Sequence, residues 1–173
     1  MKELSDILTL ATQRIAAMYF QLSIDGGDPV FRERVYCYEL YHQMRKNWPN
    51  NCMYFLNGEL DKRAHPILRM LGADYAKPDL LIHTPGAMNG NHAIIEVKHS
   101  TVASGVRKDL KTLDLFVQRV GYERAIYLIY GREANSEGIA RIEAIANDFP
   151  ELAPIEVWLH SDVNQPATHI TTL

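Results

Sequence analysis

The 173-residue sequence has only two cysteines, no Gly-rich phosphate loop and no hydrophobic run long enough to cross a bilayer. Cys37 and Cys52 lack CxxC or His-linked spacing, which favours two reduced thiols over a disulfide or a zinc site. The missing phosphate loop argues against an NTPase. Polar residues, among them Glu3 and Asp6, interrupt the N-terminal segment and argue against a signal peptide or a membrane span there. We expect a soluble, cytoplasmic protein with no membrane partner.

An excess of positive charge is also missing. The formal net charge is -3 and the sequence pI is about 6.1, so no overall basic field attracts the chain to nucleic acid. This balance counts mildly against a polyanionic partner, although a local basic patch is compatible with an acidic whole. The hydrophobic fraction of 47% and the charged fraction of 23% are ordinary for a globular protein. The length suits one domain, and we expect residues 1–173 to form it.

Two helices are expected before the first strand. Apolar residues at helical spacing predict an amphipathic helix from Leu4 to Met18, with Ile7, Ala11 and Ile15 on the same face. The segment IDGGDP predicts a turn, and its Asp28-Pro29 predicts the opening of a second helix. This helix is expected over residues 30–47, and its apolar side is expected to carry Phe31, Val35, Tyr38 and Tyr41 or His42.

The rest of the chain alternates between strand and helix patterns. The segment 124–131 is almost entirely apolar, as in a strand that is covered on both faces. The order α-α-β-β-β-α-β-α-β predicts an α/β fold in which a mixed sheet is flanked by helices on both faces. After residue 160 the tail is expected to be either an edge strand or an ordered extension. The expected strands are 53–60, 79–84, 93–99, 124–131 and 155–160, and the expected helices among them are 104–119 and 136–147.

Three charged residues on the second and third expected strands suggest chemistry. Glu96 and Lys98 point to the same face of their strand because side chains alternate, and Asp79 begins the preceding strand. Two adjacent carboxylates repel each other unless one is protonated or a cation lies between them. A hard divalent ion such as Mg²⁺ suits carboxylate and carbonyl oxygens. Lys98 is placed to orient a nucleophile or to stabilise a transition state.

Pro78-Asp79, followed by Glu96-Val97-Lys98, resembles the signature of the PD-(D/E)XK nucleases, which include restriction endonucleases and Holliday-junction resolvases. The family core, αβββαβ, matches the expected order from about residue 30 to residue 131. The resemblance implies a restriction-endonuclease-like sheet and the hydrolysis of phosphodiester bonds, with DNA as the expected substrate. It also implies that Asp79, Glu96 and the carbonyl of Val97 bind Mg²⁺ or Mn²⁺.

The resemblance extends to two helices. Glu39 occupies the place of a helical glutamate that often contributes to the metal site in this family, and Glu59 is an alternative acidic contributor. The helix after the Glu96-Val97-Lys98 segment resembles the basic helix often found there. Arg107, Lys108 and Lys111 are therefore expected to contact backbone phosphates, with a mixed, solvated helix face as the alternative.

Other readings of the same residues remain open. His83 and His99 lie close to the motif, but we expect both to be hydrogen-bonded residues at the edge of the site and not participants in catalysis. A catalytically inactive nucleic-acid-binding or assembly module that keeps the nuclease fold is the main alternative function, and a protein-interaction domain is a third. The sequence leaves open whether the substrate is DNA or RNA, whether cleavage is endo- or exonucleolytic, and whether the chain forms a homodimer.

Overall fold

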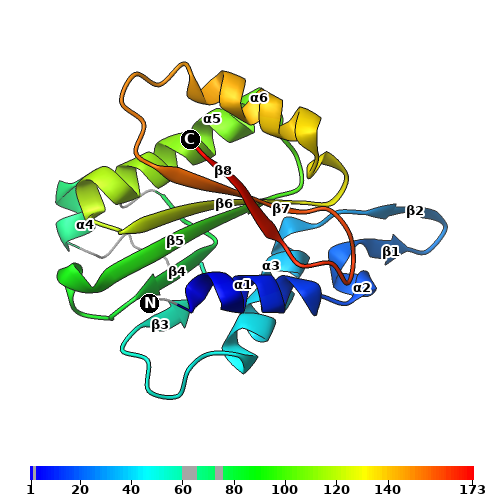
Figure 1. Cartoon of the computed structure of the whole chain (residues 1–173), viewed down its shortest axis with the longest axis horizontal. Coiled ribbons are helices and arrows are strands. Elements are labelled where there is room, and N and C mark those ends of the chain that lie inside the picture. The colour runs from blue at the N-terminus through cyan, green and yellow to red at the C-terminus, as the bar shows by residue number, and fades with distance from the viewer. Residues whose placement is uncertain (2, 60–65, 73–75) are drawn as a thin grey trace.

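A six-stranded mixed sheet forms the centre of the protein (Figure 1). The computed structural model describes residues 1, 3–59, 66–72 and 76–173, without the side chains of residues 66 and 67. The strands lie in chain order across the sheet, and only β5–β6 and β6–β7 pair in parallel. They are β3 (Phe55–Asn57), β4 (Leu80–His83), β5 (Asn91–Lys98), β6 (Arg124–Tyr130), β7 (Ile155–His160) and β8 (Thr168–Thr172).

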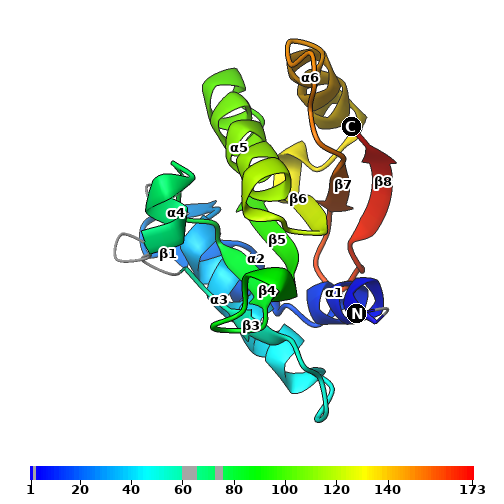
Figure 2. The ribbon, with the colours of Figure 1, turned by 90° about the vertical axis from the view of Figure 1, so that its left-hand side faces the viewer.

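Helices cover both faces of this sheet, as the sequence predicts (Figure 2). On one face lie α1 (Leu4–Gln13), α2 (Ala17–Phe20) and α3 (Glu33–Lys46). On the other lie α4 (Pro66–Met70), α5 (Ala103–Leu115) and α6 (Ser136–Ala146). Each face has its own cluster of buried apolar side chains, since alternate residues of the central strands enter opposite clusters. Short helical turns complete the fold at Met88–Gly90, Phe116–Val120 and Gly131–Glu133.

The central part of the fold agrees closely with the sequence prediction. Every residue of β6 after Arg124 is buried, as expected of a strand that is covered on both faces. The tail after residue 160 is an edge strand, β8, which pairs with β7. The helix expected over 104–119 is α5 with a π-helical continuation, and Gly121 follows it with a φ of 83°. The sequence order therefore predicted the mixed α/β sheet correctly.

The N-terminal third differs from the prediction. The first helix ends at Gln13, so Met18 belongs to the separate helix α2 and is 63% exposed instead of buried. Asp28-Pro29 does not open a helix but lies in β2 (Gly27–Val30), which forms a hairpin with β1 (Leu22–Ile24). Gly26, with a φ of 72°, adopts a left-handed conformation between these strands. The hairpin delays the start of α3 to Glu33, three residues after the expected start.

Two smaller differences concern the segments between α3 and β4, whereas the two free thiols agree with the prediction. The strand expected over 53–60 is limited to β3, and residue 60 lies outside the described residues. The short helix α4 was not predicted. Both cysteines are free, and Cys37 is buried whereas Cys52 is half-buried. In the part of the chain that the structure describes, none of the helices is long and apolar enough to span a membrane.

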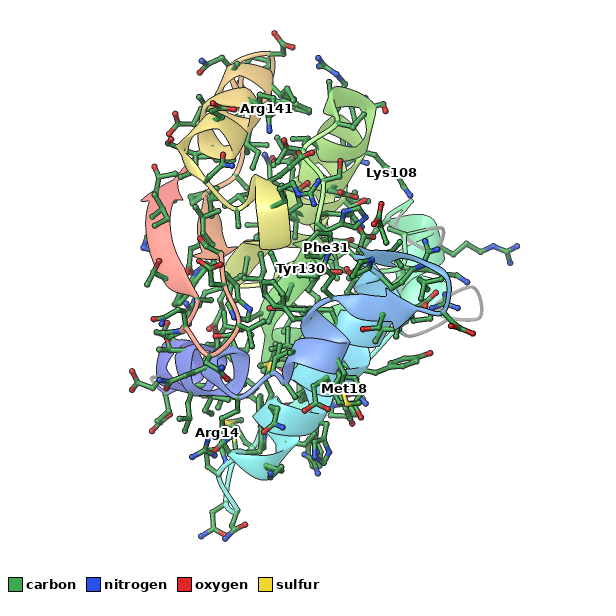
Figure 3. All side chains as sticks on the ribbon, turned by 90° about the vertical axis from the view of Figure 1, so that its right-hand side faces the viewer. Arg14, Met18, Phe31, Lys108, Tyr130 and Arg141 are labelled. Carbon is green, nitrogen blue, oxygen red and sulfur yellow. The ribbon has the colours of Figure 1, made fainter. Side chains whose placement is uncertain are left out.

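An aromatic cluster fixes α3 against the sheet. The Tyr36 hydroxyl shares a 2.6 Å hydrogen bond with Nδ1 of the buried His160 on β7. The Tyr36 ring stacks on Tyr130 of β6, with 3.8 Å between the ring centroids. Phe31 meets Tyr130 edge-on at 5.9 Å, and these two residues lie next to each other in Figure 3. These contacts set the rotation of α3, and with it the direction in which Glu33 points.

Removing the Tyr36 hydroxyl should therefore destabilise the fold. We expect Tyr36→Phe to lower the free energy of unfolding by about 1–3 kcal/mol, because His160 loses its buried partner. Tyr38→Phe, on the exposed side of the same helix, should leave the stability unchanged. Urea denaturation followed by circular dichroism measures both. Equal stability of the two variants would show that the Tyr36–His160 bond does not anchor α3.

Candidate functional site

The register of β4 and β5 brings Asp79 and Glu96 together. Leu80 pairs with Ile95 and Leu81 with Ile94 in an antiparallel ladder, so one step further Asp79 comes opposite Glu96. Leu81 and Ile94 enter the cluster below α5, and by strand alternation Asp79 and Glu96 point to that same face. The sequence prediction that these two carboxylates lie on one side of the sheet agrees with this geometry.

Asp79 and Glu96 differ in their surroundings. Asp79 directly precedes β4, and its side-chain Oδ2 accepts a 2.8 Å hydrogen bond from the backbone N–H of Val97 on β5. Glu96 is only 5% exposed. Burial, followed by the neighbouring charge of Asp79, raises the pKa of Glu96 well above its ordinary value, and Lys98 opposes this shift. Without a cation the pair therefore favours a proton on Glu96.

Lys98 is surrounded by carboxylates from three elements. Its ammonium nitrogen lies 3.4 Å from Glu33 Oε2 on α3 and 3.9 Å from Glu96 Oε2 on its own strand. On α5, Asp109 Oδ2 is also 3.9 Å away. Burial lowers the pKa of Lys98, but the carboxylates, Asp109 foremost, outweigh burial and raise the pKa above its ordinary value. Lys98 is therefore a permanently charged ammonium at physiological pH.

Asp109 is a site residue that the sequence analysis did not find. It lies on the sheet-facing side of α5, is 4% exposed, and its Oδ2 accepts a 3.3 Å hydrogen bond from the Tyr127 hydroxyl of β6. Burial raises the pKa of Asp109 from its ordinary value to about 6, although Lys98 and Tyr127 favour the charged form. A signal was present in the sequence: Val106, Leu110 and Leu113 define the buried face of this helix, and Asp109 lies within it.

A cavity of about 800 Å³ opens above these residues. Its walls come from the strand ends, from the segment before β4 and from α5. Of the described side chains in the lining, three are carboxylates and five are cations, so their formal charge is +2 although the whole chain carries -3. The cations are Lys77, Lys98, Arg107, Lys108 and Lys111, and the carboxylates are Asp79, Glu96 and Asp109.

The three basic residues expected on α5 all line this cavity, but they are not equivalent. Arg107 is bound by Asp148 at 2.6 Å, and its guanidinium lies 5.9 Å from the centre of the Phe149 ring. Lys108 and Lys111 are exposed, and no described carboxylate lies within ion-pair distance of either. Lys108 extends away from its helix in Figure 3. The two lysines are therefore the cations available to an anionic ligand.

The helical glutamate that contacts Lys98 is Glu33, whereas the sequence predicts Glu39 in this place. The Oε1 atom of Glu39 accepts a 2.6 Å hydrogen bond from Gln43 of its own helix, and the structure does not bring Glu39 to Asp79, Glu96 or Lys98. Glu33 contacts Lys98 and lies 3.5 Å from the backbone N–H of His99. The two glutamates are six residues apart, which places them on different sides of a helix with 3.6 residues per turn.

The remaining candidates lie around this centre. Glu59 forms ion pairs with Arg34 at 3.5 Å and Lys77 at 3.9 Å, and it lines a second cavity together with Asp79. His83 is 2.9 Å from Asn57 across the β3–β4 pair. His99 stacks on Phe31, with 5.9 Å between the ring centroids. Both histidines thus have structural partners.

The donor set at Asp79 and Glu96 is compatible with a magnesium ion. Among the residues that the structure describes, no three His, Cys, Asp or Glu side chains are grouped to hold a metal ion. Mg²⁺, however, commonly uses one or two carboxylates and keeps several water ligands. Asp79 and Glu96 supply two carboxylates, and a strand residue directs its N–H and C=O to the same side, so Val97 presents its carbonyl toward Asp79. A cation there would also relieve the repulsion that raises the pKa of Glu96.

Comparisons of the chain with protein-family models, with curated proteins and with solved structures find no match.

The raised pKa of Asp109 predicts a pH effect on stability. Asp109 keeps its proton in the folded state up to about pH 6, whereas in the unfolded chain it loses it near pH 3.8. The folded state binds more protons in this window, so this group lowers the free energy of unfolding as the pH rises, by up to about 3 kcal/mol.

We expect Asp109→Asn to remove this contribution. The stability of the wild type relative to Asp109→Asn should therefore fall from pH 4 to pH 6, as measured by urea denaturation at several pH values. Asp25→Asn, in the exposed turn between β1 and β2, is the control and should show no such trend. A pH-independent difference for Asp109→Asn would mean that Asp109 is ionised throughout.

Proposed function

We propose that the protein is a metal-dependent nuclease of the PD-(D/E)XK type, with a restriction-endonuclease-like core and DNA as its expected substrate. The observation that carries the proposal is the convergence of Asp79, Glu96 and Lys98 on one cavity that exposed lysines also line. A site with carboxylates alone would repel a phosphodiester. A site that only binds DNA would use its lysines and would not require a buried pair of acids. Together they suit the hydrolysis of a phosphodiester with Mg²⁺ or Mn²⁺.

Asp79, Glu96 and the Val97 carbonyl would hold the metal ion. When bound, such an ion lowers the pKa of a coordinated water and offsets negative charge on the phosphate. The chain contributes the rest. Lys98 donates hydrogen bonds from a charged ammonium to the oxygens on which negative charge develops, and its carboxylate neighbours keep it oriented. Because these neighbours also keep Lys98 protonated, its role is electrostatic and it does not act as a general base.

The cations of α5 fit the role of phosphate contacts. Lys108 and Lys111 lie one turn apart on the cavity side of the helix and are exposed. They are placed to neutralise phosphates that flank the cleaved bond, which would make the affinity for DNA depend on salt. Arg107 is the weaker candidate, since Asp148 already binds its guanidinium.

The first test separates catalysis from binding. We expect the wild type to cleave DNA in the presence of Mg²⁺ or Mn²⁺, and Lys98→Ala to lose about 100-fold or more in rate, as is typical when one preorganised electrostatic group is removed. Arg119→Ala, at an exposed position outside the cavity, is the matched control and should retain activity. The assay uses linear, branched, single-stranded and supercoiled DNA. Binding of DNA without cleavage of any form would favour the inactive binding module.

The second test identifies the acids that hold the ion. Glu96→Gln should abolish most of the rise in melting temperature caused by millimolar Mg²⁺, and should leave the metal-free protein equally or more stable, because one member of a repelling pair is neutralised. Among the helical acids, Glu33→Gln should reduce cleavage by loosening Lys98, and Glu39→Gln should not. A full Mg²⁺ response in Glu96→Gln, or a larger loss in Glu39→Gln than in Glu33→Gln, would contradict the assignment.

A further inference from the structure

A second cavity, of about 600 Å³, adjoins the proposed site. It lies between α3 and the start of β4, and Asp79 lines both cavities. Glu33, which contacts Lys98, also lines it. A ligand in this second cavity would therefore lie next to the metal ion and the phosphate that the proposed site binds at Asp79.

The walls of the second cavity are aromatic and acidic. Tyr38 is 69% exposed, although Tyr36, Cys37 and Leu40 of the same helix are buried. Tyr41, three residues later, is half-buried and lines the same cavity. Arg34 is the one cation among the described residues of the lining, and Glu59 pairs with it at 3.5 Å. Phosphate is thus disfavoured in this cavity, whereas a flat group that stacks on tyrosine and donates hydrogen bonds to carboxylates is favoured.

The two cavities thus suit different parts of a nucleotide, the first its phosphates and the second its base. The first has the free lysines, Lys108 and Lys111, for phosphates, and the second has Tyr38 and Tyr41 for a ring. Nucleobases have a π-face that stacks on aromatic side chains and N–H groups that donate to carboxylate oxygens. A cavity of this volume is within the range of ordinary ligand pockets.

We propose that this second cavity is a base subsite, in which Tyr38 and Tyr41 receive the base of the nucleotide next to the cleaved phosphate. The inference rests on the proposed nuclease function and narrows its substrate class. A base whose face stacks on a tyrosine cannot at the same time remain stacked between its neighbours in a continuous duplex, so it must come from a single strand or be turned out of the helix. The preferred substrate is accordingly DNA that is single-stranded or unpaired at the cleaved position.

The base subsite is tested by measuring DNA binding by fluorescence anisotropy in Ca²⁺, which supports binding but poorly supports cleavage. The probes are a labelled single-stranded oligonucleotide and the duplex of the same sequence. We expect the wild type to bind the single strand more tightly, and Tyr38→Ala to weaken that binding about tenfold, as for the loss of one base–aromatic stack. Tyr38→Phe should keep the affinity, since a phenyl ring also stacks. Tyr19→Ala, at a 40% exposed tyrosine on α2, is the matched control and should bind like the wild type.

A crosslinking arm locates the base directly. Single-stranded DNA with 5-iododeoxyuridine at each position in turn should photocrosslink to the peptide that contains Tyr38 and Tyr41. Three results would overturn the subsite. They are crosslinks only to other peptides, an equal effect of Tyr38→Ala on both DNA forms, and no binding of single-stranded DNA. The nuclease proposal is judged separately by cleavage in Mg²⁺. Cleavage with an unaffected Tyr38→Ala refutes the subsite alone, and crosslinking at Tyr38 without any cleavage refutes the nuclease function alone.

Discussion

The ammonium of Lys98 joins three elements that would otherwise repel one another. Carboxylates reach it from α3, from its own strand and from α5, at 3.4 Å to Glu33 and at 3.9 Å to both Glu96 and Asp109. Removing the ammonium from this half-buried cluster would leave the carboxylates uncompensated, which makes the whole arrangement depend on Lys98. The same attraction fixes the lysine at the cavity. One ion cluster therefore ties the two helical layers to the sheet and orients the group that the proposed reaction needs.

Much of this site was predictable because it depends on strand geometry. Period-2 alternation places Glu96 and Lys98 on one face, and a short connection between antiparallel strands brings Asp79 alongside. The all-apolar segment of β6 predicted a central strand, since its burial on both faces leaves no room for polar residues. Such rules are local, and they hold whatever else the chain does.

The prediction of which side of α3 is buried is wrong for an identifiable reason. The expected apolar stripe of α3 ran through Val35, Tyr38 and Tyr41, but the buried positions are Tyr36, Cys37, Leu40, Gln43 and Met44. Tyrosine is ambiguous in such a pattern because its ring suits either a core or a surface. The Tyr36–His160 bond and the preceding hairpin set the rotation of the helix, and neither was visible as a local pattern. The family resemblance points to Glu39, but the rotation of α3 directs Glu33 to Lys98 instead.

The place of Asp109 on the apolar face of α5 is visible in the sequence, but its partners are visible only in the tertiary structure. In the sequence it is one acid among the lysines of a mixed helix, and only the packing of α5 on β6 brings it to Tyr127 and Lys98.

The proposed nuclease requires Asp79 and Glu96 to hold a divalent ion together beside Lys98. Anomalous diffraction from crystals soaked in Mn²⁺ shows where such an ion binds. We expect one strong Mn²⁺ peak within coordination distance of both carboxylates and of the Val97 carbonyl, and no such peak in Glu96→Gln crystals. A peak bound elsewhere on the chain, or no peak between Asp79 and Glu96 at saturating Mn²⁺, would contradict this assignment.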